Sequence, residues 1–180
     1  MFIVLTGNPN SGKTQIINLL KDNGYDVFEV DQFVKQLYEV NNIGYILIST
    51  HFGKDFLKKD RVDTKKLAQL VLHNDYELYR LKILIWPLIK SKLYWLKKRY
   101  KNMVVEMAIF KNDPLYFNGI FDLSIELTRN DEYKEQNEKQ KFNKWYNSHT
   151  CFFPDYIVEN NTDILCAYND VLNIIKKFYE

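Results

Sequence analysis

The chain has 180 residues, a length at which one domain with a sizeable core is expected. Its 25 basic and 23 acidic residues leave a formal net charge of +2, which suggests neither nucleic acid nor an anionic membrane as a partner. The longest apolar run, 83–89, is broken by Pro87 and is too short to span a bilayer, and the first apolar stretch ends too early for a signal peptide. Cys151 and Cys166 have no paired spacing and no histidine beside them in a ligand pattern, so we expect reduced thiols in a cytoplasmic protein.

In chain order, short apolar segments predict β-strands and longer segments with apolar residues at helical spacing predict helices. The predicted strands are 2–5, 25–30, 103–108, 121–127 and 156–159. The predicted helices are 14–20, 33–40, 45–52, 64–73, 76–85, 88–100 and 165–179. Strands separated by helical segments indicate the α/β class, with a five-stranded parallel sheet between helices on both faces.

The stretch GNPNSGKT, residues 7–14, fits the phosphate-binding pattern G-x-x-x-x-G-K-[ST]. Its glycines let successive backbone N–H groups point at phosphate oxygens, while Lys13 reaches the β- and γ-phosphates and the Thr14 hydroxyl ligates Mg²⁺. The pattern requires a strand before the loop and a helix after it, and both are predicted here. A tight turn with an incidental lysine is the alternative. The predicted nucleotide-binding residues are Gly7, Asn10, Ser11, Gly12, Lys13, Thr14 and Gln15.

Three charged residues stand at predicted strand ends, where ligands gather in open α/β sheets. Asp31 follows the second strand, and a carboxylate there accepts the proton of an attacking hydroxyl; it also stands where a helix N-cap is favoured. Glu106, in the third strand, is either a second acid that supports the metal or a satisfied carboxylate at a strand end. Arg129 joins the fourth strand to a polar segment, 130–148, and we expect it to contact the nucleotide phosphates when that segment closes.

These features predict a single P-loop kinase domain over 1–180. Its core would comprise 1–30, 102–129 and 155–180, a helical region would occupy 31–101, and a short lid would occupy 130–150.

The stretch from 51 to 89, with the glycine loop and Asp31, resembles the dephospho-coenzyme A kinase family. In that family an FG dipeptide is followed by D-x-x-x-L-D-R-K-x-L-x-x-x-V-F and then His-Pro. The letters HFG at 51–53 and VDTKKL at 62–67 stand in the corresponding places. Near the other end, DYIVEN at 155–160 is similar to the family's A-D-x-V-I-x-N, so the resemblance covers nearly the whole chain.

The resemblance implies that the protein transfers the γ-phosphate of ATP to the 3′-hydroxyl of dephospho-coenzyme A. It implies that Asp31 is the base, that Lys13 and Thr14 serve ATP and Mg²⁺, and that the helical region binds the coenzyme. The expected substrate contacts are Asp31, Phe52, Asp63 and Glu106.

The sequence departs from the family at several acceptor positions. Thr64 stands where the family has Arg, Trp86 where it has His, and 106–112 replaces the segment D-x-P-L-L-F-E. The lid is also shorter and poorer in arginine, and lysine does not reproduce the bidentate fork of arginine. Two alternatives stay open: another small-molecule kinase, acting on a nucleoside or nucleoside monophosphate, and a catalytically weakened nucleotide-binding regulatory member. No oligomeric state is predicted.

Overall fold

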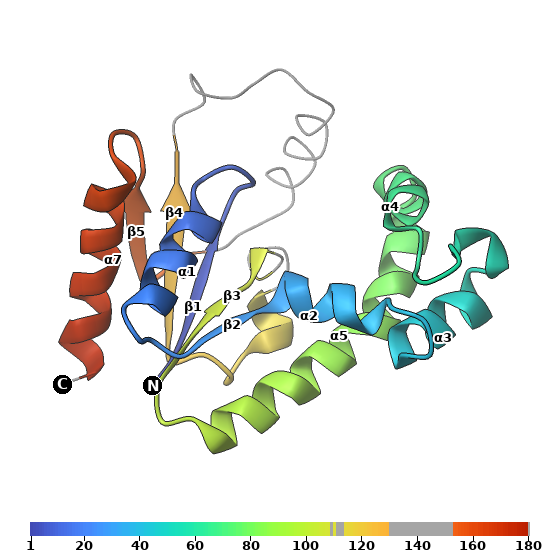
Figure 1. Cartoon of the computed structure of the whole chain (residues 1–180), viewed down its shortest axis with the longest axis horizontal. Coiled ribbons are helices and arrows are strands. Elements are labelled where there is room, and N and C mark those ends of the chain that lie inside the picture. The colour runs from blue at the N-terminus through green and yellow to red at the C-terminus, as the bar shows by residue number, and fades with distance from the viewer. Residues whose placement is uncertain (109, 111–113, 130–152, 180) are drawn as a thin grey trace. The chain divides into compact units, whose positions relative to one another are not determined.

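Five parallel strands form one sheet in the computed structural model, which describes residues 1–108, 110, 114–129 and 153–179 (Figure 1). The strands are β1 (Phe2–Gly7), β2 (Val27–Glu29), β3 (Met103–Glu106), β4 (Leu123–Thr128) and β5 (Tyr156–Glu159). Their order across the sheet is β2-β3-β1-β4-β5, and all four pairings are parallel. The predicted five-stranded parallel sheet is confirmed, and β1 lies at its centre.

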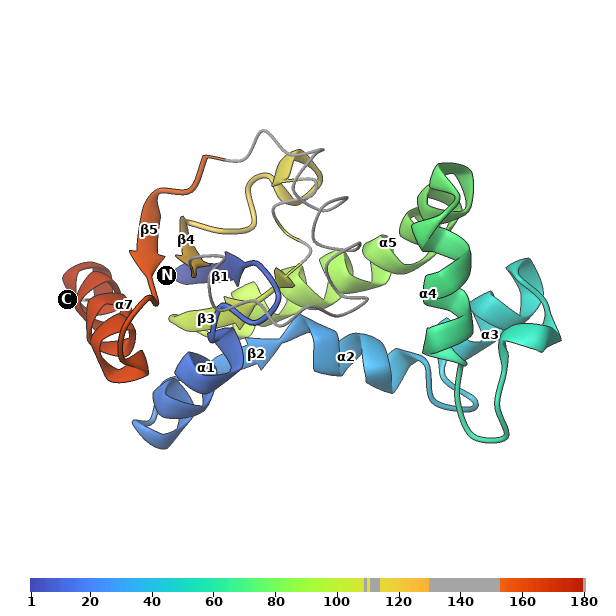
Figure 2. The same ribbon diagram turned by 90° about the horizontal axis from the view of Figure 1, so that it is seen from above.

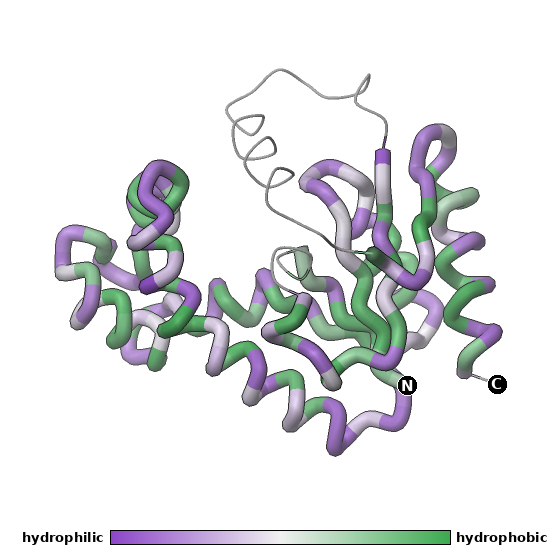
Figure 3. Tube along the Cα trace, turned by 180° about the vertical axis from the view of Figure 1, so that it is seen from behind, coloured by the Kyte–Doolittle hydropathy of each residue, from purple (hydrophilic) through white to green (hydrophobic). Residues whose placement is uncertain are grey.

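Alternating side chains of β1 point to opposite faces of the sheet. Ile3 and Leu5 are fully buried in a core cluster that also contains residues of α1 (Lys13–Asp22) and α7 (Ile164–Tyr179). Figure 2 shows these two helices beside each other on this face of the sheet. The hydrophobic colouring of the strands in Figure 3 matches their burial.

The opposite face is covered by aromatic side chains that follow β3. The Phe2 ring stacks on Phe121 with ring centroids 6.0 Å apart, and Phe110 meets Phe121 edge-to-face at 5.2 Å. Lys97, near the end of the helix that precedes β3, donates hydrogen bonds to the Ile120 carbonyl at 2.5 Å and to Asp122 at 2.8 Å. The central strands β1 and β3 are therefore buried on both faces, which accounts for their continuous apolar runs.

The chain divides into two compact units, Met1–Glu29 with Leu96–Glu180, which contains the sheet, and Val30–Trp95, which is helical. The helical unit begins with α2 (Val30–Leu37), α3 (Ile43–His51), the 3₁₀ turn η1 (Lys54–Phe56) and α4 (Thr64–Leu72). It continues into α5 (Asp75–Arg99), and the boundary between the units falls within this helix.

The structure differs from the prediction in α5 and in β2. The predicted helices 76–85 and 88–100 are one continuous helix, α5, with Pro87 inside it. A proline removes a single backbone hydrogen bond, and here the buried Ile85, Trp86 and Ile89 flank it on both sides, so packing outweighs that loss. The second strand is also shorter than predicted, because Val30 is already helical and fully buried.

No helix in the described part of the chain is long and apolar enough to cross a membrane. Cys166 is an exposed free thiol, while Cys151 and the predicted lid, 130–150, lie outside the described residues.

Candidate phosphate-binding site

The loop between β1 and α1 depends on two glycines. Gly7 has φ +141° and Gly12 has φ +99°, backbone conformations that side-chain-bearing residues rarely adopt. A Cβ on Gly7 would lie 2.1 Å from the Leu127 carbonyl oxygen, and a Cβ on Gly12 would lie 2.4 Å from Nδ2 of Asn160. Both glycines are therefore required by backbone conformation and by the close approach of neighbouring groups.

The Lys13 side chain folds back along this loop. It is 7% exposed, and its ammonium donates hydrogen bonds to the carbonyls of Gly7 at 2.9 Å and Asn8 at 2.8 Å. These bonds hold a positive charge at the loop, beside the N-terminus of α1, where the helix dipole and backbone N–H groups favour an anion. Gly12 occupies the N-cap of α1, and as a glycine it has no side chain that could bond the N–H groups of the first turn.

Two further predicted residues lie near the loop by strand register. Gly7 pairs with Leu127 in β4, and Arg129 follows two residues later as an exposed side chain. Leu5 pairs with Glu106 in β3, a residue that is only 7% exposed. The carboxyl ends of three neighbouring strands thus bring a cationic and an anionic side chain to the edge of the sheet that carries the loop.

Asp31 lies two residues beyond the end of β2, in the first turn of α2. Glu29 at the end of β2 pairs with Glu106, so β2 ends at the same edge of the sheet as β3. Because α2 begins at Val30, Asp31 is inside the helix and does not occupy the N-cap position. Its side chain is exposed, and an acid in the first turn is favoured by the helix dipole.

The predicted substrate residues of the helical unit have structural contacts. Asp63 is the N-cap of α4: its carboxylate accepts the Lys66 N–H at 3.2 Å, and this hydrogen bond lowers the pKa of Asp63. A contact with Lys58 at 3.2 Å adds to the effect. Phe52 packs edge-to-face on the Phe56 ring at 6.2 Å, and the Arg80 guanidinium lies 5.1 Å from its centroid.

The positions that depart from the family pattern have different surroundings. Thr64 is the exposed first residue of α4, directly after the capping Asp63. Trp86 is 7% exposed, and Nζ of Lys82 lies 4.6 Å from its ring. A buried indole at this position has no acid–base chemistry, unlike an imidazole.

Asn160 is a site residue that the sequence analysis did not assign. It follows β5, is 4% exposed, and donates from Nδ2 to the carbonyl of Ser11 at 2.8 Å. The similarity of DYIVEN at 155–160 to the family pattern was the only sequence signal, and it did not indicate a contact across 149 positions.

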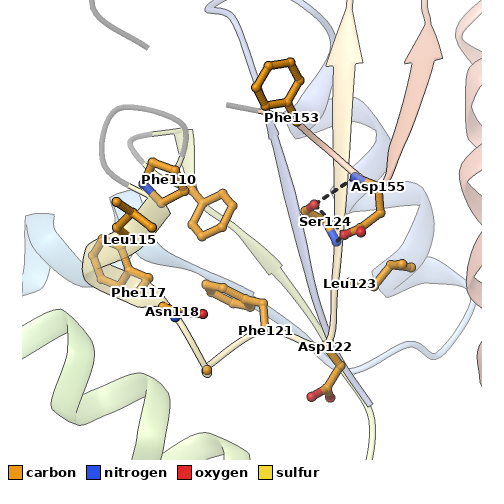
Figure 4. A pocket seen from close by; sticks show the side chains of 12 residues that line it. Phe110, Leu115, Phe117, Asn118, Phe121, Asp122, Leu123, Ser124, Phe153 and Asp155 are labelled. Atoms are coloured by element: carbon orange, nitrogen blue, oxygen red, sulfur yellow. Dashed lines mark hydrogen bonds between the residues drawn. The ribbon is translucent and has the colours of Figure 1, made fainter. Parts of the chain in front are cut away.

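A separate cavity of about 430 Å³ lies near the beginnings of β4 and β5 (Figure 4). Its lining includes Phe110, Phe121 and Phe153, with Ser124 and Asp155 joined by hydrogen bonds, the shortest of them 2.6 Å. Ser124 pairs with Val4, whereas the glycine loop begins where Leu127 pairs with Gly7. Three residues of strand span roughly 10 Å, so this cavity is separate from the phosphate loop.

The fold and the loop define a P-loop kinase: a five-stranded parallel sheet whose central strand carries the G-x-x-x-x-G-K-[ST] turn into a helix. Comparison with known proteins specifies the family. The profile of the family described as dephospho-CoA kinase matches residues 1–145, and the chain belongs to this family. A dephospho-CoA kinase of Mycoplasma genitalium is 31% identical over 188 residues, covering 100% of this chain and 94% of that protein.

Solved structures agree in fold. A crystal structure of a Thermus thermophilus protein superposes with a TM-score of 0.75 at 16% identity, covering 99% of this chain and 97% of the other. A Campylobacter jejuni dephospho-CoA kinase superposes with a TM-score of 0.58 at 18% identity, covering 98% and 96%. At these identities the solved structures support the fold alone, and the assignment to the family rests on the sequence matches.

Proposed function

We propose that this protein transfers the γ-phosphate of ATP to the 3′-hydroxyl of dephospho-coenzyme A, giving coenzyme A and ADP. The observation that carries the proposal is a fully formed phosphate loop, with its buried lysine, in a chain that belongs to the dephospho-CoA kinase family. Membership of the family supports dephospho-coenzyme A as the acceptor, and the loop accounts for nucleotide binding.

Nucleotide binding would rest on the loop residues from Gly7 to Gln15. Backbone N–H groups of the loop and of the first turn of α1 would bind the phosphates, and the Lys13 ammonium would exchange its loop carbonyls for β- and γ-phosphate oxygens. Arg129, at the end of β4, would add a second cation to the charge that develops on the transferred group.

Mg²⁺ would bind through few protein ligands. The exposed hydroxyl of Thr14 and the carboxylate of Glu106 are oxygen donors, which Mg²⁺ prefers, and the ion typically takes its other ligands from phosphates and water. When bound, it would neutralise charge on the β- and γ-phosphates.

On the acceptor side, Asp31 would orient the 3′-hydroxyl and take its proton as the hydroxyl oxygen bonds to the γ-phosphorus. The bond from the γ-phosphorus to the bridging oxygen breaks, and ADP leaves with that electron pair. The support for Asp31 is its position two residues beyond β2, within the first turn of α2. Phe52, in the helical unit, would contact the coenzyme, and Asp63 would act through the N-cap that starts α4.

A direct assay tests the proposal. Purified protein with Mg-ATP is incubated with dephospho-coenzyme A, AMP, CMP, UMP, adenosine or nicotinamide riboside, and phosphorylated products are identified by mass. We expect one added phosphate on dephospho-coenzyme A, in a product that co-elutes with coenzyme A. Preference for a nucleoside monophosphate would overturn the acceptor. ATP binding without transfer to any acceptor would indicate a non-catalytic member, in line with the changed positions Thr64 and Trp86.

A further inference from the structure

Asn160 links the end of β5 to the phosphate loop. Its backbone N–H donates to the Thr128 carbonyl at 2.8 Å, which continues the β4–β5 pairing by one residue. Its side-chain Nδ2 donates to the Ser11 carbonyl at 2.8 Å, in a buried position. The side chain therefore lies on an anchored backbone and reaches a loop that belongs to a strand two positions away in the sheet.

The Asn160 side chain also approaches Gly12 of the loop closely. A Cβ on Gly12 would lie 2.4 Å from Nδ2 and 3.6 Å from Cγ of Asn160, so the amide occupies the space that a side chain at position 12 would need. Gly12 is the residue directly before Lys13, at the N-cap of α1. The amide thus packs against the turn that starts the phosphate-binding helix.

The hydrogen bond fixes the orientation of one peptide group. The Ser11 carbonyl and the Gly12 N–H belong to the same planar trans peptide, so they point in opposite directions. When Asn160 holds the carbonyl on its own side, the Gly12 N–H is turned away from Asn160. Correct orientation of such N–H groups before binding lowers the cost of ordering them around a phosphate.

We propose that Asn160 is a positioning residue that pre-organises the phosphate loop by fixing the Ser11–Gly12 peptide. The inference rests on the proposed function only in requiring that the loop binds a nucleotide; the acceptor has no part in it.

The test compares Asn160→Ala and Asn160→Asp with the control Asn161→Ala. Asn161 is the next residue, and its amide donates to the Glu159 carboxylate at an exposed position. Calorimetric titration with Mg-ATP in the absence of any acceptor gives the Kd. We expect Asn160→Ala to raise the Kd about tenfold, as loss of one buried hydrogen bond predicts, and the control to stay within about twofold of wild type. Amide exchange of 8–14 without nucleotide should become faster in Asn160→Ala and stay unchanged in Asn161→Ala.

The aspartate variant separates positioning from packing, because it keeps the shape of the amide. At pH 8 the introduced carboxylate would face the Ser11 carbonyl without a proton to donate, so binding should be at least as weak as in Asn160→Ala. Burial beside a carbonyl favours the protonated acid, which donates like the amide, so at pH 5 the Kd relative to wild type should recover to about threefold. Asn160→Ala should show no such recovery relative to wild type.

Wild-type-like Kd in Asn160→Ala, or a Kd ratio for Asn160→Asp that is independent of pH, would overturn the inference. If Asn160→Ala does not fold, Asn160→Asp decides the question through its pH dependence. Failure of the proposed function would look different: wild type would bind Mg-ATP, the Asn160 effects on Kd would persist, and no phosphate would reach dephospho-coenzyme A.

Discussion

Replacing Gly7 with alanine tests whether the close contact between β1 and β4 sets the shape of the phosphate loop. The added Cβ would lie 2.1 Å from the Leu127 carbonyl oxygen and 3.1 Å from its carbon, far inside the 3.4 Å at which ordinary contact begins. Relief requires movement of two paired central strands, because Gly7 and Leu127 are partners in the sheet. Gly24→Ala is the matched control: Gly24 also has positive φ, +81°, but a Cβ there would meet nothing within 4 Å.

The control isolates the backbone cost, which is about 1–2 kcal/mol for a left-handed residue with a side chain. Gly7→Ala adds the cost of overpacking, about 1–3 kcal/mol, so we expect a loss of about 2–5 kcal/mol. Urea unfolding measures both values, and Mg-ATP titration measures binding, which should be lost in Gly7→Ala and retained in Gly24→Ala. Equal free-energy losses in the two variants, or intact nucleotide binding in Gly7→Ala, would refute the steric reasoning.

Three further outcomes are expected. Lys13→Ala should abolish phosphoryl transfer, because it removes the loop's ammonium, and thermal unfolding should confirm that the fold survives; wild-type turnover would contradict the assignment. Asp31→Asn keeps the size of the side chain but removes its basicity, so kcat should fall by about two to four orders of magnitude at nearly unchanged ATP affinity, and an active variant would exclude the base role. Burial would raise the pKa of Asp122, but hydrogen bonds from Lys97 and the Phe2 N–H outweigh it and lower the pKa. Asp122→Asn should therefore lower Tm at neutral pH. The difference in Tm between wild type and variant should disappear as the pH falls below the ordinary pKa of an aspartate, because acid then protonates the wild-type carboxylate. A difference in Tm that does not depend on pH would contradict this.

The sheet and the loop could be predicted because their signals are local. A buried parallel strand is a short apolar run, and the glycine loop needs its special residues at fixed spacing within eight positions. The continuous helix α5 was missed because Pro87 is a strong local signal for a break. Burial of the residues around Pro87 outweighs that signal, and burial depends on the tertiary fold.

Asn160 could not be assigned from the sequence for a related reason. Its partner, Ser11, lies 149 positions earlier, and the two meet only because β5 lies next to β4 and β4 next to β1. Asp63 shows the reverse case: the family pattern predicts a substrate contact, and the structure adds that this carboxylate caps α4. Both roles are compatible, since a cap that fixes the start of a helix also fixes the residues around it.

The matches to the family pattern and the departures from it fall at different places along the chain. The glycine loop, with Lys13 and Thr14, lies in the unit that contains the sheet and matches its pattern at every diagnostic position. Thr64 and Trp86, which depart from the family pattern, lie in Val30–Trp95. The third departure, 106–112, lies in the unit that contains the sheet. We therefore expect the glycine loop to set nucleotide affinity and the departing positions of both units to set acceptor preference. A member that binds Mg-ATP normally but phosphorylates dephospho-coenzyme A slowly would point to these departing acceptor positions, because the glycine loop keeps its full pattern.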